Sequence, residues 1–145
     1  MTSKVCMTRA TAIAGLLLAL SLPAAAGQTV KVELWNKPDG TQGLTLTPSQ
    51  VKAGEVTFEI TNESTNLEHE FLIYKTDKSA DGMPMNQDGD RVDEGKIAGF
   101  QEGGDLPEGA SKTWSTKLGP GKYLAFCNEQ GHYMAGMHTM LTVTP

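Results

Sequence analysis

The chain has 145 residues, with 12 basic residues against 17 acidic ones and a formal net charge of −5. This length predicts one domain. The acidic balance argues against nucleic acids and anionic membrane surfaces as partners, because both repel a negatively charged protein. It would suit a basic partner protein, although acidic surfaces also serve solubility alone.

The first 26 residues have the pattern of a cleaved secretory signal. Lys4 and Arg9 give a positive start, residues 10–22 form a short apolar run, and small residues precede a cleavage point after Ala26. The apolar run is too short to span a bilayer, which needs about 20 apolar residues. We therefore expect a periplasmic, monomeric protein formed by residues 27–145, with 10 basic and 17 acidic residues, no membrane span and a net charge of −7.

Seven short segments of the remaining chain have the composition of β-strands. Residues 30–35 and 55–61 alternate apolar and polar side chains, as half-buried strands do. The other five predicted strands are residues 44–47, 70–75, 111–117, 122–127 and 140–144. Short strands separated by turn residues predict an all-β, Greek-key β-sandwich of about 7–8 strands.

One segment interrupts this rhythm. Residues 76–104 are rich in Asp, Gly and Asn, and only residues 97–100 look ordered. We interpret the segment as a long insertion loop with at most one helical turn.

Cys127 is the single cysteine of residues 27–145. A lone thiol in an oxidising compartment is open to oxidation. It therefore needs a protected role, as a metal ligand, a nucleophile or a buried apolar residue.

Two further metal-ligand side chains follow Cys127 at regular spacing, His132 and Met137. Gly131 and Gly136 stand just before them and permit a tight backbone. Residues of one loop cannot surround an ion, so another strong ligand must come from elsewhere, and His69 opens a predicted strand. Two imidazoles and a thiolate in a plane, with a weak axial thioether, are the ligands of a blue-copper site.

The spacing Cys-x4-His-x4-Met beside a glycine-rich turn resembles the ligand loop of the cupredoxins, the group of plastocyanin, azurin and rusticyanin. Residues 66–71 resemble the segment that supplies the first histidine of that family. The resemblance covers nearly all of residues 27–145. It implies a β-sandwich with one type 1 copper ion at one end, held by His69, Cys127, His132 and Met137, and a role in single-electron transport.

The same resemblance implies a docking surface. His132 would lie near the surface as the electron port, within an apolar patch that includes Tyr133, Met134 and Ala135. A redox protein, such as a cytochrome or another copper protein, would dock there. Two positions depart from the family pattern. Glu70 replaces an Asn that ties the two ligand segments together in many relatives, and Gln130 stands where many relatives have Pro.

Several alternatives stay open. Met134 and Met140 compete with Met137 as the axial ligand, and a methionine is often only a core residue. Zinc also accepts cysteine and histidine, so a zinc-bound or metal-free structural module is possible. We expect no enzyme activity, because the sequence has no acid–base dyad, serine elbow or phosphate loop. Copper enzymes related to this fold also combine several such domains.

Methionines in the insertion suggest a second role. If Met83 and Met85 are exposed there, they could bind Cu(I) with Met134 or His138; otherwise they belong to a flexible loop that partly covers the sandwich. His138 is otherwise expected to be an exposed residue that points away from the site. This reading describes a periplasmic copper-tolerance protein that buffers or delivers copper.

Overall fold

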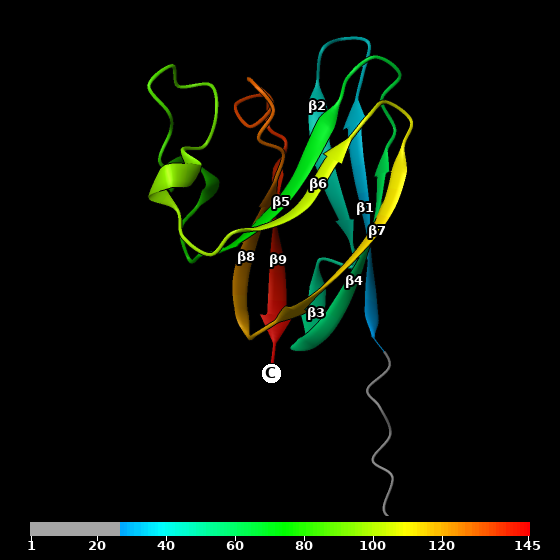
Figure 1. Cartoon of the computed structure of the whole chain (residues 1–145), viewed down its shortest axis with the longest axis vertical. Helices are drawn as coiled ribbons and strands as arrows, with labels where there is room; N and C mark the ends of the chain where they lie inside the picture. Colours follow the sequence, from blue (N-terminus) through cyan, green and yellow to red (C-terminus); the bar gives the residue numbers. More distant parts are fainter. Residues whose placement is uncertain (1–26) are drawn as a thin grey trace, which may run out of the picture.

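The computed structural model describes residues 27–145, and the predicted signal segment lies outside the described residues. Figure 1 shows two β-sheets packed face to face. The first sheet has the order β2 (Gln42–Thr47), β1 (Gln28–Asn36), β4 (Gly54–Asn62) and β7 (Ser111–Leu118). The second has the order β3 (Gln50–Lys52), β9 (His138–Thr144), β8 (Gly121–Phe126), β5 (His69–Lys75) and β6 (Gln101–Leu106).

Both sheets are mixed. β1 runs parallel to β4 and β3 runs parallel to β9, while the other neighbours are antiparallel. The predicted all-β sandwich is confirmed, and each of the seven predicted strands corresponds to an observed one. The nine observed strands include two that the sequence did not reveal, β3 and β6.

The strand β6 was missed because its sequence, Gln-Glu-Gly-Gly-Asp-Leu, lacks the branched and aromatic residues of typical strands. Its glycines are needed where β6 pairs with β5. A Cβ atom at Gly103 would lie 2.8 Å from the ring of Phe71, too close for any other residue. The pairing also shifts register between Phe71 and Leu72. The predicted insertion is therefore shorter than expected and ends at residue 100.

The main core lies between the sheets. Alternate residues of β1 and β4 point inward, and Phe58 is fully buried with its ring 5.4 Å from the rings of Phe71 and Trp114. Cys127 and Met137 are fully buried members of the same cluster. The candidate site is thus built into one end of the core, where packing fixes its side chains.

A smaller cluster covers the outer face of the second sheet. Leu72, Leu124 and Phe126 from the sheet pack there against buried side chains of the insertion. The insertion contains two short 3-10 turns, η1 (Ala80–Gly82) and η2 (Glu94–Lys96), and it lies beside β8 in Figure 1. Met83 is therefore not exposed, since only 5% of its surface is accessible, and the segment covers the sandwich as the second interpretation of it predicts.

Candidate metal centre

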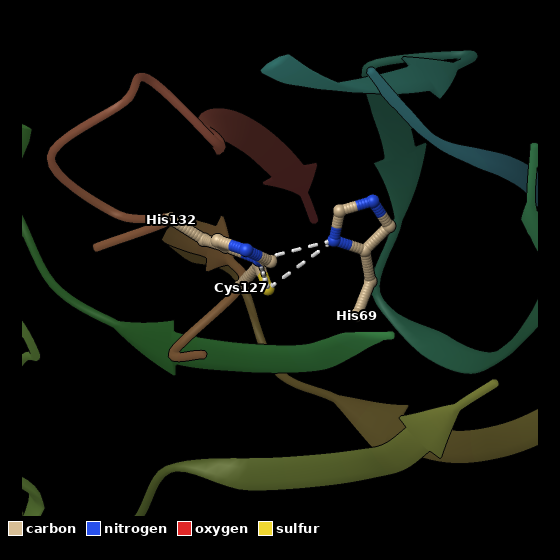
Figure 2. A group of neighbouring side chains, drawn as sticks. All are labelled: His69, Cys127 and His132. Carbon is tan, nitrogen blue, oxygen red and sulfur yellow. Dashed lines mark hydrogen bonds between the residues drawn. The ribbon is translucent and has the colours of Figure 1, made fainter. Parts of the chain in front are cut away.

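The site is assembled from the ends of two neighbouring strands and one turn. His69 is the first residue of β5, and Cys127 directly follows β8. Leu72 pairs with Phe126, so the start of β5 lies beside the end of β8. His132 lies in the turn between β8 and β9. Figure 2 shows the three side chains converging on one point.

The turn that carries His132 is closed by backbone hydrogen bonds. The N–H of Cys127 donates to the carbonyl of Met137 (3.0 Å), and the N–H of Met137 donates to the carbonyl of His132 (3.1 Å). Gly131 and Gly136 adopt φ values of 78° and 98°, which favour glycine. The roles inferred for both glycines from the sequence are therefore present in the structure.

Three potential metal-donor atoms, two imidazole nitrogens and one sulfur, face one another in this site. The two Nδ1 atoms of His69 and His132 are 3.1 Å apart, and Cys127 Sγ lies 4.0 Å and 3.5 Å from them respectively. The circle through the three atoms has a radius of about 2.1 Å, and bonds from a transition-metal ion to imidazole and thiolate measure about 2.0–2.3 Å. A single ion at its centre would bond all three atoms.

Burial sets the protonation state of these groups. It lowers the pKa of His69 to about 4, with the neighbouring His132 adding to the effect, and it also lowers the pKa of His132. Burial raises the pKa of the Cys127 thiol to about 11, although the N–H of Glu70 donates to its sulfur at 3.3 Å. At neutral pH the metal-free site therefore holds two neutral imidazoles, ready to coordinate, and one thiol that must lose its proton.

This arrangement predicts the proton balance of metal binding. Loading the protein with Cu(II) at pH 8 should release about one proton per ion, because only the thiol is protonated and metals bind the thiolate. A pH indicator in weakly buffered solution measures the release. The variant Cys127→Ser should release almost none, and a wild-type protein that released none would not use its thiolate as a ligand.

The three candidate axial methionines lie in different surroundings. Met137 is fully buried in the main core with Cys127. Met140 instead packs against the smaller cluster, and Met134 is 64% exposed. Met137 is therefore the thioether best placed to be a fourth ligand.

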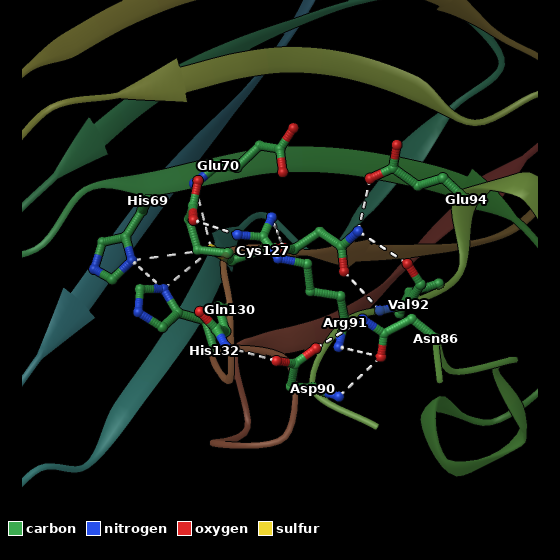
Figure 3. Close-up of polar contacts among 12 residues, drawn as sticks. His69, Glu70, Asn86, Asp90, Arg91, Val92, Glu94, Cys127, Gln130 and His132 are labelled. Atoms are coloured by element: carbon green, nitrogen blue, oxygen red, sulfur yellow. Dashed lines mark hydrogen bonds and ion pairs between the residues drawn. The ribbon is translucent and has the colours of Figure 1, made fainter. Parts of the chain in front are cut away.

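The insertion holds the ligand loop through a buried asparagine that the sequence did not single out. Asn128 accepts a hydrogen bond from the N–H of Val92 (2.7 Å) and donates to the carbonyl of Val92 (3.1 Å). It also donates to a carboxylate oxygen of Glu94 (2.6 Å). Figure 3 labels Val92 and Glu94, the two partners of Asn128, together with Cys127. The side chain next to the thiol is thus fixed by a segment more than 30 residues away in sequence.

Two neighbours of Val92 extend this contact. Arg91 donates to the carbonyl of Asn128 (2.9 Å) and pairs with Glu129 (3.1 Å). Asp90 accepts hydrogen bonds from the side chain of Gln130 (2.8 Å) and from the N–H of Gly131 (2.9 Å). Gln130, one of the two departures from the family pattern, therefore anchors the loop to the insertion.

The other departure, Glu70, is half-buried next to His69 at the start of β5 (Figure 3). Burial, followed by repulsion from Glu94, Asp105, Glu129 and Glu102, raises its pKa to about 7. Its backbone N–H still donates a hydrogen bond to the sulfur of Cys127 (3.3 Å). This backbone hydrogen bond joins the two ligand segments, whereas Asn128 and residues 90–92 join the ligand loop to the insertion.

Glu70 and His69 should affect the acid stability of the metal-free protein in opposite directions. The unfolded state binds more protons at His69 between pH 4 and 6.5, so this residue favours folding as the pH rises. The folded state binds more protons at Glu70 between pH 4.5 and 7, so this residue favours folding as the pH falls.

Single substitutions separate the two contributions. In urea unfolding between pH 4.5 and 6.5, Glu70→Gln should make stability rise more steeply with pH than in the wild type, by about 1 kcal/mol per pH unit. His69→Leu should shift the slope by a similar amount in the other direction. Equal slopes for both variants would contradict the assigned protonation states.

The expected apolar docking patch needs a correction. Tyr133 is buried, and its hydroxyl donates to the carbonyl of Ala80 in the insertion (2.7 Å). Among residues 27–145, Met134 is the exposed large hydrophobic side chain, and Ala135 beside it is also exposed. His138 is half-buried against the ring of Tyr133 (4.9 Å between centroids), so the expectation of a free, exposed histidine is wrong.

Within residues 27–145, one group of three or more His, Cys, Asp or Glu side chains is close enough to hold a metal ion, and it is His69, Cys127 and His132. The same part of the chain contains no helix of the length and apolar character needed to cross a membrane.

Comparison with known proteins places the fold. No family model and no curated protein matches the sequence. Similar solved structures include reduced auracyanin from Roseiflexus castenholzii, at 23% identity over 83% of this chain and 100% of that one, with a TM-score of 0.54. Auracyanin B matches at 23% identity over 86% and 94% of the two chains, with a TM-score of 0.55. Rusticyanin from Thiobacillus ferrooxidans matches at 17% identity over 82% and 79%, with a TM-score of 0.56. The chain therefore has the cupredoxin fold.

Proposed function

We propose that this protein binds one copper ion as a type 1 site and carries single electrons between redox proteins. The observation that carries the proposal is the triangle of His69 Nδ1, His132 Nδ1 and Cys127 Sγ, which leaves room for one ion at bonding distance. Met137 is the proposed axial ligand. The similar structures support this assignment, since rusticyanin is described as a copper protein and auracyanin was crystallised in a reduced state.

The donor set suits an ion that changes charge by one electron. Bound copper would supply the Cu(II)/Cu(I) couple, in which the thiolate favours Cu(I) and the imidazoles hold Cu(II). His69 and Cys127 are fully buried at adjacent strand ends, and the insertion fixes the loop between Cys127 and His132. Such a rigid frame keeps nearly the same geometry in both states, which makes electron transfer easier.

Electron exchange with a partner needs a route to the surface. His132 is the half-buried ligand of the three, and exposed Met134 and Ala135 follow it in the loop. We infer that a redox partner, such as a cytochrome or another copper protein, docks over these residues. The net charge of −7 for residues 27–145 favours a partner with a basic face.

The proposal includes export and a carrier role. Residues 1–26 act as a cleaved signal, and residues 27–145 work as a single periplasmic domain. A metal ligand role would protect the lone thiol of Cys127 in that oxidising compartment. The protein would be a carrier rather than an enzyme.

Copper titration of residues 27–145 tests the proposal. We expect one copper per chain, an intense band near ~600 nm from thiolate-to-copper charge transfer, and loss of the band on reduction with dithionite and its return on reoxidation. A protein that stays colourless after copper loading, or that prefers zinc to copper under competition, would contradict the electron-carrier role.

A second candidate function, copper buffering or delivery, is favoured by one observation. Met83, Met85, Met134 and His138 line a single cavity beside the ligand loop. That cavity is separate from the triangle described above.

A further inference from the structure

A cavity of about 220 Å³ lies between the insertion and the ligand loop. One wall comes from the insertion, and the other comes from the ligand loop and the start of β9. The lining residues with polar or sulfur-containing side chains are Asp81, Met83, Met85, Tyr133, Met134 and His138.

The methionines of the chain are concentrated at this cavity. Residues 27–145 contain five methionines, of which Met137 and Met140 belong to the packing already described. The remaining three all line the cavity, although Met134 is about 50 residues from the other two along the chain. Core packing does not account for Met134, which is 64% exposed.

The two walls are held in place relative to each other. Tyr133 from the ligand loop donates to Ala80 of the insertion (2.7 Å), and Asp90 of the insertion accepts from Gly131 (2.9 Å). Met85 forms an isolated β-bridge with Val92, whose backbone is held by Asn128. The fold therefore presents sulfur-containing side chains from both segments to one preformed space.

The chemistry of these groups selects a particular kind of ion. Thioethers are soft ligands that prefer Cu(I) and bind hard cations poorly, and imidazole also accepts copper. The acidic residue Asp81 also lines the cavity. We propose that the cavity binds one Cu(I) ion through Met83, Met85 and Met134, with His138 as a further ligand.

This site would give the protein a second copper ion that takes no part in the coloured centre. The thioethers do not supply the thiolate that produces the visible band. An ion held there could be stored or passed on as Cu(I), which is what copper buffering or delivery requires. The proposal does not depend on the electron-carrier role, because the two sites share no ligand.

Silver titration of the copper-loaded protein tests the site, after reduction with dithionite and anaerobic removal of the excess reductant, which would otherwise reduce Ag(I) to the metal. Ag(I) is a soft substitute for Cu(I), and the reduced protein is diamagnetic. With 13C-methyl-labelled methionine, NMR should show shifts of the Met83, Met85 and Met134 methyl signals that saturate at one Ag(I) per chain. The Met137 and Met140 signals and the copper content should stay unchanged.

Two variants sharpen the result. Met83→Leu/Met134→Leu should lose the bound Ag(I), while the control Met140→Leu should keep it. Unshifted cavity methyls, or silver that displaces copper and shifts Met137, would overturn the proposal. Cavity methyls that shift in a protein lacking the blue band would support this site and contradict the electron-carrier role instead.

Discussion

The variant Cys127→Ser should lose the visible charge-transfer band completely. A serine hydroxyl does not ionise near neutral pH and has no sulfur lone pair to transfer charge to copper. Serine has nearly the shape of cysteine, so the fold should remain while the colour disappears. Visible absorption after copper loading, with circular dichroism to confirm folding, measures both.

A matched substitution controls for packing changes. Met140→Leu lies in the smaller cluster outside the triangle and should keep the full band. If Cys127→Ser retained the band, or if Met140→Leu abolished it, copper would be held somewhere other than the triangle.

The variant Asn128→Ala should have the largest effect on stability outside the ligands. Asn128 and Val92 are each only 2% exposed, and truncation would leave the N–H and carbonyl of Val92 without partners. Each unpaired buried group costs about 1–3 kcal/mol, so the two groups together should cost about 2–6 kcal/mol. Urea unfolding of the metal-free protein measures the free energy of unfolding directly.

The same variant should also disturb the metal centre. Freeing the residue next to Cys127 loosens the thiolate, so the visible band should shift and copper should dissociate faster than in the wild type. The control Gln130→Ala removes one exposed hydrogen bond to Asp90 and should cost under about 1 kcal/mol. Equal stability of Asn128→Ala and wild type would show that the insertion does not support the ligand loop.

Local sequence patterns were sufficient to predict most of the sandwich. The strands β1 and β4 alternate strictly, and burial in the structure follows that alternation. The ligand loop could be predicted equally well, because its signals are local. They are the spacing of Cys127, His132 and Met137 and the glycines that precede the last two. His69 could be proposed because it opens a strand, and the structure brings its ring to the loop.

The long-range contacts could not be predicted in this way. A polar, glycine-rich stretch indicates a loop, yet Met83, Val92 and Ile97 within it cover the outer face of the second sheet. The sequence signal for the packing of the insertion lies in the strands of the second sheet. Leu72 and Leu124 fall at positions that should face solvent in a bare sandwich, so apolar residues there could have shown which face is covered.

The surroundings of individual side chains also depend on the insertion, which covers the second sheet. Tyr133 was expected on the surface, but the insertion buries it. Asn128 looked like an ordinary loop residue, because nothing near it in sequence shows that Val92 is its partner. The contact that holds the ligand loop to the insertion therefore lies at a position that no local pattern marks.

Copper K-edge X-ray absorption of the copper-loaded protein tests the central claim most directly. The triangle predicts two imidazole nitrogens and one short thiolate sulfur around the ion, at about 2.0–2.3 Å. A copper ion surrounded only by nitrogen and oxygen, with no sulfur at bonding distance, would contradict it.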